Sequence, residues 1–104
     1  MSSIERDYYT IASIEALPDA TQRELADYLN MSLGKMNYCL KDLEAKGWVC
    51  LDAVQRNDGT WAKLYTLTPK GCALKQDLIA QFVALKKAEL KKIESEINLA
   101  EQLI

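Results

Sequence analysis

The central helix of the chain is encoded by Ser32-Leu-Gly-Lys-Met-Asn-Tyr-Cys-Leu-Lys-Asp-Leu-Glu-Ala-Lys-Gly47. Ser32 can cap the first free N–H groups of a helix, and Gly47 can adopt the left-handed conformation that ends the last turn. Apolar residues recur at spacings of three and four, which predicts that one side of the helix faces a core: Leu33, Met36, Leu40 and Leu43.

The opposite side of this predicted helix is polar near its N-terminal end. Besides Ser32 it carries small, cationic, amide and phenolic residues: Gly34, Lys35, Asn37, Tyr38 and Lys41. Lysine can bind phosphates, and asparagine can bond a base edge in the major groove. We therefore interpret this side as a DNA-reading surface. The alternative is an ordinary pair of packed helices inside a small helical domain.

A second helix is predicted at turn distance before the first. Thr21-Gln-Arg-Glu24 has the pattern of a capping box, and Leu25, Ala26 and Leu29 form an apolar stripe after it. Only Asn30 and Met31 separate this stripe from Ser32. Two helices joined so tightly predict a helix-turn-helix, in which the second helix enters the groove.

A β-hairpin is predicted directly after the central helix. Residues 48–54 and 61–67 are rich in β-branched and aromatic side chains, and the turn cluster at residues 55–60 separates them. A hairpin in this place predicts the wing of a winged-helix domain. Arg56 and Lys63 are the candidate phosphate contacts on it, and Asn57 lies at its tip; the alternative is a solvated hairpin tip. We expect Trp48 and Trp61 to anchor the wing to the helices.

Helices are predicted at both ends of the chain. The first runs from about Ser2 to Leu17, with a capping-box pattern at Ser2 and Glu5, and packs beneath the helix pair. The last begins at Thr68-Pro69, with Gly71 as a weak point, and its first turns can be buried through Cys72, Leu78 and Phe82.

The last helix carries an apolar repeat of more than three heptads, as in a coiled coil. Its members are Ile79, Val83, Leu90, Ile93, Ile97 and Ile104, with Lys86 and Ala100 completing the spacing. So small a domain cannot cover this helix, so we predict that it drives homodimerisation. The sequence thus predicts a mainly α (α+β) fold: a winged helix-turn-helix DNA-binding domain over residues 1–71 and a dimerisation helix over residues 72–104.

The charge of the chain is distributed unevenly. The net charge of −2 over 104 residues argues against a strongly basic, nonspecific nucleic-acid binder. Residues 1–31 hold two cations and six acidic residues, whereas residues 32–70 hold six cations and four acidic residues. The segment proposed to contact DNA is therefore the positive one, and its small excess predicts binding that depends on dimerisation and specific contacts.

The remaining composition argues against an enzyme, a metalloprotein and a membrane protein. Cys39, Cys50 and Cys72 lack the spacing of metal ligands, and the chain contains no histidine. We predict no metal and no cofactor, and we expect reduced thiols; a redox-sensing role for an exposed Cys39 is a minor hypothesis. No nucleophile–base arrangement or phosphate-binding loop is present. Neither a signal peptide nor a long apolar run is present, which predicts a cytoplasmic protein.

Four blocks of the sequence resemble the MarR group of bacterial transcriptional regulators, and within it the short subgroup associated with exopolysaccharide biosynthesis loci. They are residues 22–26, 32–41, 46–47 and 65–71. The resemblance implies a winged-helix fold, homodimers and promoter binding. It also implies that the residues facing DNA include Ser32, Gly34, Lys35, Asn37 and Tyr38.

The chain departs from larger members of that group in two respects. Asp58-Gly59-Thr60 stands where their wing has Asp-x-Arg, so the minor-groove contact of that arginine is not carried over, and Arg56 and Lys63 are the candidates to replace it. The chain also has fewer residues with which to build a small-molecule effector cleft, so no effector is carried over. A winged helix that binds another protein is the alternative function, and the sequence leaves the operator, the sign of regulation and the orientation of the dimer helices open.

Overall fold

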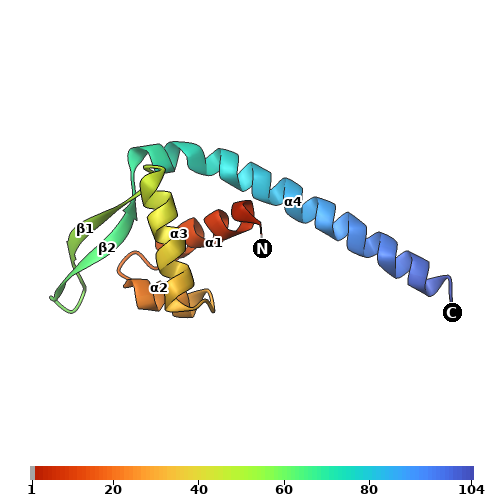
Figure 1. The fold of residues 1–104 in the computed structure, drawn as a ribbon, viewed down its shortest axis with the longest axis horizontal. Helices are drawn as coiled ribbons and strands as arrows, with labels where there is room; N and C mark the ends of the chain where they lie inside the picture. The colour runs from red at the N-terminus through yellow and green to blue at the C-terminus, as the bar shows by residue number, and fades with distance from the viewer. Residues whose placement is uncertain (1) are drawn as a thin grey trace.

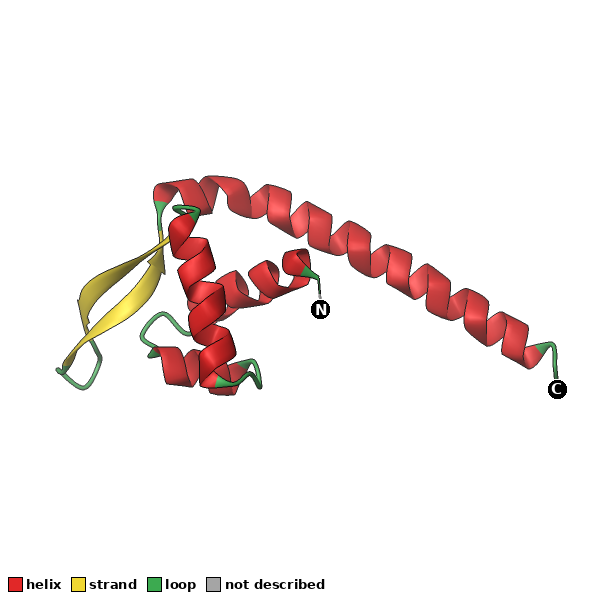
Figure 2. Ribbon diagram, in the orientation of Figure 1, coloured by secondary structure: helices red, strands yellow, loops and turns green. Residues whose placement is uncertain are grey.

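The computed structural model describes residues 2–104 as four helices and one two-stranded antiparallel sheet (Figure 1). The elements follow the order α1 (Ser3–Ala16), α2 (Gln22–Tyr28), α3 (Leu33–Ala45), β1 (Val49–Gln55), β2 (Trp61–Leu67) and α4 (Pro69–Glu101). Figure 2 shows the hairpin of β1 and β2 projecting to one side of the helices. The predicted winged helix-turn-helix, with its long last helix, is confirmed.

Each helix begins at a side-chain cap that the sequence indicated. One hydroxyl before each helix accepts a hydrogen bond from the backbone N–H three residues later: Ser2, Thr21, Ser32 and Thr68. At Thr21 the Glu24 carboxylate bonds back, so the predicted capping box is present. At Ser2 the predicted box is only half formed, because the Glu5 carboxylate accepts instead from Lys86 on α4, at 3.2 Å.

The core is built around α3. Met36, Leu40 and Leu43 are fully buried and pack against apolar side chains of every other element: Ile11, Ile14, Leu25, Ala26, Val49, Tyr65 and Leu78. The predicted core position Leu33 is wrong, because this side chain is 40% exposed. Leu33 is the first residue of α3 and lies beyond the elements that cover the next turns.

Cys39 lies on the buried side of α3, whereas Leu33 does not. Its side chain is completely buried, which contradicts the exposed position expected for it. Burial raises the pKa of the Cys39 thiol, and the nearby Arg6 guanidinium only partly offsets this effect. A buried neutral thiol reacts slowly, so the structure does not support the redox hypothesis.

The start of α4 crosses the backbone between α3 and β1 in close contact. The Thr68 hydroxyl donates to the Gly47 carbonyl at 2.6 Å, and the Thr68 N–H donates to the Trp48 carbonyl at 3.0 Å. A Cβ placed on Gly71 would lie 2.1 Å from that same Trp48 oxygen. This close contact therefore requires glycine at position 71, where the sequence alone indicated only a weak point of the helix.

The helix α4 leaves the body of the molecule after about half its length. Leu78 is buried, and the Phe82 ring stacks on Tyr8 of α1 with 3.8 Å between ring centroids, whereas Cys72 is exposed, contrary to the prediction. From Leu90 onward every side chain is exposed, and the helix extends the molecule to 61 Å (Figure 1). No helix within residues 2–104 has the length and apolar character needed to span a membrane.

The two tryptophans have different environments. Trp48 packs against the core, with the Lys46 ammonium 5.2 Å from its ring centroid, so the predicted anchor is confirmed there. Trp61 is 67% exposed, and the same prediction is wrong for it. Trp61 begins β2 and pairs with Gln55 at the outer end of the hairpin, where its ring is open to solvent.

This difference predicts losses of stability of different size for two matched substitutions. Trp48→Ala should lower the free energy of unfolding by roughly 2 kcal/mol, somewhat below the value for a fully buried aromatic ring. Trp61→Ala should change it by less than about 0.5 kcal/mol, as for an exposed side chain. Thermal unfolding followed by circular dichroism measures both, and equal losses would contradict the assignment of Trp48 as the anchor.

Candidate nucleic-acid interface

The turn between α2 and α3 is fixed by backbone hydrogen bonds. Asn30 has a φ of +54°, a left-handed conformation that asparagine tolerates better than most residues. The N–H of Met31 then donates to the Ala26 carbonyl at 2.8 Å, which closes the end of α2. Ser32 follows immediately as the cap of α3, so the two helices are held at a fixed angle.

The predicted DNA-facing residues of α3 lie on its solvent side. All are exposed: Ser32, Gly34, Lys35, Asn37, Tyr38 and Lys41. No atom lies within 4 Å of a Cβ built on Gly34, and within residues 2–104 the Lys35 ammonium makes no ion pair. The N-terminal half of α3 thus presents an open surface, next to the α2–α3 turn and far from the end of α4 (Figure 1).

The remaining candidate cations differ in how firmly the protein holds them. Lys41 pairs with Glu44 at 3.5 Å, and its pKa is raised, first by the nearby Tyr65 phenol and then by Glu44. Lys63 is exposed on β2 and has no ion pair in the part of the chain that the structure describes. Arg56 is half-buried, and its guanidinium donates to Glu24 at 2.7 Å.

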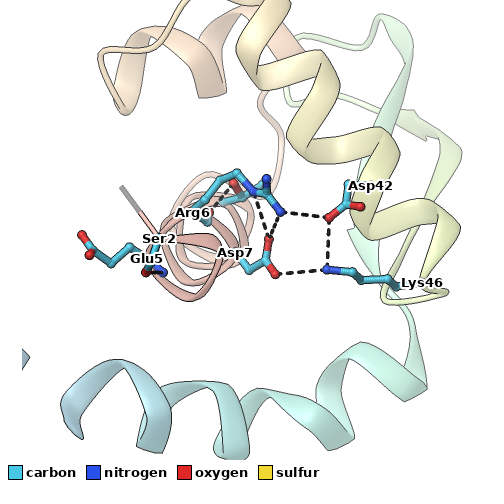
Figure 3. A network of polar contacts seen from close by, with 7 residues as sticks. Ser2, Glu5, Arg6, Asp7, Asp42 and Lys46 are labelled. Carbon is cyan, nitrogen blue, oxygen red and sulfur yellow. Dashed lines mark hydrogen bonds and ion pairs between the residues drawn. The ribbon is translucent and has the colours of Figure 1, made fainter. Parts of the chain in front are cut away.

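An ion-pair network that the sequence did not reveal joins α1 to α3 behind this surface. Figure 3 shows Arg6 and Asp7 of α1 facing Asp42 and Lys46 of α3. Lys46 lies 3.3 Å from Asp7 and 3.1 Å from Asp42, and Arg6 lies 3.1 Å from Asp42. Asp7 is only 5% exposed, and these cations are the partners of its buried carboxylate. No local signal could have found a network between residues so distant in sequence.

This network also bears on the exposed face of α3. Burial lowers the pKa of Lys46, but bonding to Asp42 and Asp7 outweighs it, so the net pKa is raised and the cation persists. The Arg6 guanidinium lies 5.5 Å from the centroid of the Tyr38 ring. The network therefore fixes α3 against α1 and supports one predicted interface residue from behind.

The side chains at this surface suit contacts to nucleic acid. Among residues 2–104 there is no group of three or more histidine, cysteine or acidic side chains that could hold a metal ion. What the surface offers is a helix end with cations, an amide and a phenol, flanked by a hairpin with an exposed lysine.

The comparison with protein families agrees with this geometry. Residues 11–49 match the family of winged helix-turn-helix DNA-binding domains. Solved structures specify the fold further. Staphylococcus aureus MepR in its DNA complex superposes on this chain with a TM-score of 0.63 at 18% sequence identity, and the match covers 93% of this chain and 73% of that one. The chain has the winged-helix fold of MarR-type regulators.

Other structures with the MarR-type fold give similar values. Staphylococcus aureus MarR in complex with salicylate and kanamycin matches with a TM-score of 0.59, 19% identity, and coverage of 93% of this chain and 68% of that one. A further MarR family transcription regulator matches with a TM-score of 0.58 at 18% identity, over 92% of this chain and 73% of that one. No curated protein matches the sequence. At these identities the MarR-type likeness concerns the fold.

Proposed function

We propose that this protein is a transcription regulator, and not an enzyme, that binds double-stranded DNA as a homodimer. The division of α3 carries the proposal: one side is buried through Met36, Cys39, Leu40 and Leu43, and the other exposes polar side chains at the N-terminal end. In a helix-turn-helix, that end of the second helix is the part that contacts base edges. The DNA complex of MepR, which shares the fold, supports the same mode here.

The exposed residues divide into base-reading and backbone-binding positions. Lys35 and Asn37 lie near the N-terminal end of α3, where side chains reach the bases. Ser32 and Gly34 allow a close approach of the helix, and Tyr38 lies beside them. Lys41, further along α3, and Lys63, on the wing, are assigned to phosphates.

The homodimer is proposed from the uncovered apolar side of α4. The repeat begins near the body of the protein, where Ile79 is half-buried, and continues through exposed residues: Val83, Leu90, Ile93, Ile97 and Ile104. Lys86, within the same repeat, instead bonds Glu5 and Glu89 of its own chain. Two copies joined along this side would present two recognition helices, which can bind half-sites about 34 Å apart.

We retain the division into a DNA-binding part, residues 1–71, and a dimerisation helix, residues 72–104, as part of this proposal. The helix α4 runs without a break across that boundary, and Leu78 beyond it contributes to the core. The resemblance of the sequence extends the proposal to promoters of exopolysaccharide biosynthesis genes and to a cytoplasmic location. Sequencing the fragments that the protein binds from a genomic library tests this assignment of target genes. Recovery of fragments at random would contradict it.

Substitutions on α3 should separate base reading from phosphate binding. Asn37→Ala should cost roughly 1–3 kcal/mol on the selected site and leave nonspecific binding nearly unchanged. Lys41→Ala should weaken binding to selected and scrambled duplexes alike and reduce the salt slope by about one unit. Titrations of both duplexes at several salt concentrations measure these effects.

A lysine far from the surface provides the control. Lys87 lies on α4, is exposed, and makes no ion pair among the described residues, so Lys87→Ala should leave the salt slope unchanged. Equal losses on both duplexes for Asn37→Ala would assign Asn37 a structural role. Absence of any preference for the selected duplex over the scrambled one would contradict the proposed function.

A further inference from the structure

The tip of the wing is attached to the helix-turn-helix by three polar contacts. The Arg56 guanidinium donates to the Glu24 carboxylate at 2.7 Å and to the Asp19 carbonyl at 3.2 Å. The backbone N–H of Asn57 donates to the Asp19 carboxylate, also at 3.2 Å. We refer to Asp19, Glu24, Arg56 and Asn57 as the wing latch.

These contacts matter because little else holds the outer half of the hairpin. Burial is concentrated near its base, at Val49, Leu64 and Tyr65, whereas Gln55 and Trp61 at the outer end are exposed. An isolated two-stranded hairpin is marginally stable in water, so contacts to the body decide where its tip lies. The latch supplies contacts of this kind.

Glu24 connects the wing to the start of α2. Its carboxylate bonds the Thr21 N–H and hydroxyl in the capping box and also accepts from Arg56. The pKa of Glu24 is lowered, first by the bonds to Thr21 and then by Arg56, so the carboxylate is charged at neutral pH. One side chain therefore ties the first helix of the helix-turn-helix to the wing.

We propose that Arg56 is a positioning residue: the wing latch holds the hairpin against α2 and so places Lys63 for DNA, while the Arg56 guanidinium remains on Glu24. This inference rests on the proposed function. It differs from the prediction that Arg56 itself binds phosphate, in which case Glu24 competes with DNA for the same cation.

The two roles of Arg56 predict opposite effects of one substitution. Glu24→Gln removes the negative charge but keeps a side chain that can close the capping box, since glutamine serves at this position as well as glutamate. If Arg56 positions the wing, Glu24→Gln weakens DNA binding. If Arg56 binds phosphate directly, the same substitution frees it and strengthens binding.

A matched variant corrects for the general effect of removing an acidic residue near DNA. Asp27 lies on the same helix, is exposed, and makes no ion pair within residues 2–104, so Asp27→Asn changes the charge equally without affecting the latch. Relative to Asp27→Asn, we expect Glu24→Gln to bind the selected duplex about two- to fivefold more weakly, the range that an exposed ion pair supports. Equal or tighter binding overturns the proposal.

The coupling between the two residues gives a second measure. Arg56→Gln alone should weaken DNA binding, and Arg56→Gln combined with Glu24→Gln should be no weaker than Arg56→Gln, because both variants remove the same ion pair. If Glu24→Gln strengthened DNA binding, and did so only when Arg56 is present, the Arg56 guanidinium would bind DNA directly and the proposal would be wrong.

Amide hydrogen exchange tests the latch without DNA. The Asn57 N–H should exchange about two- to fivefold faster in Glu24→Gln and in Arg56→Gln than in the parent chain, while Asp27→Asn should leave it unchanged. Unchanged exchange in both latch variants overturns the proposal. This measurement needs no DNA, so it reports on the latch whether or not the chain binds DNA. Failure to bind any duplex specifically would contradict the proposed function and leave the latch to be decided by hydrogen exchange.

Discussion

Gly71→Ala is expected to destabilise the protein by at least about 3 kcal/mol, the upper end of the usual cost of overpacking. The added methyl group would lie 2.1 Å from the Trp48 oxygen and 3.0 Å from its carbonyl carbon. The obstacle is backbone, held by the hydrogen bond from the Thr68 N–H, so no side-chain rotation can relieve the clash. The first turns of α4 would have to move away from the turn between α3 and β1.

Chemical denaturation followed by circular dichroism measures this loss, and Gly34→Ala is its control. Gly34 is also helical, but a Cβ there would contact nothing within 4 Å. Alanine should therefore stabilise the helix at position 34 by about 0.5–1 kcal/mol, the usual gain over glycine. If Gly71→Ala were as stable as the parent chain, α4 would not contact the Trp48 carbonyl as the structure shows.

Polar substitutions in the outer half of α4 should dissociate the proposed homodimer. Ile93 and Ile97 are 51% and 49% exposed in the single chain, on the side of α4 that the proposal places in the dimer. Ile93→Asn combined with Ile97→Asn should give a monomer with an intact fold, since neither side chain contributes to the core. Loss of the second half-site should lower the affinity for a two-site duplex by about 10²- to 10⁴-fold.

Sedimentation at tens of micromolar and titration of one-site and two-site duplexes measure these two effects. Lys91→Asn combined with Lys92→Asn is the control, because it alters the same segment outside the apolar repeat. A parent chain that sediments as a monomer at this concentration would contradict the dimer. A dimer that survives the substitutions at Ile93 and Ile97 would place the contact elsewhere.

The exposed face of α3 was predictable from sequence because it depends on helical period alone. Once Met36, Leu40 and Leu43 face the core, residues such as Lys35 and Asn37 must face solvent. The helical period did not determine which residues at the edges of the apolar side of α3 are buried. Leu33 and Cys39 exchanged their expected environments, because burial at each turn depends on which neighbouring elements cover it.

The wing illustrates the same limit with polar residues. Its strands and turn follow from composition, and Gly59 in the turn has a positive φ. The place of Arg56 in the hairpin suggests a phosphate contact, but Glu24 and Asp19, more than thirty residues earlier, determine where its guanidinium lies. The size of Trp61 suggests an anchor, but its ring lies open to solvent at the outer end of the hairpin.

The sequence by itself determined the elements and their limits, because caps, turn residues and apolar periods act over a few residues. Ser32 starts α3, and Gly47 adopts the positive φ that ends it. The tertiary structure alone decided the contacts between distant segments: the Asp7 network between α1 and α3, the approach of Gly71 to Trp48, and the wing latch. Each joins residues brought together only when the helices pack, and packing depends on shape and charge across the whole core and not on any local pattern.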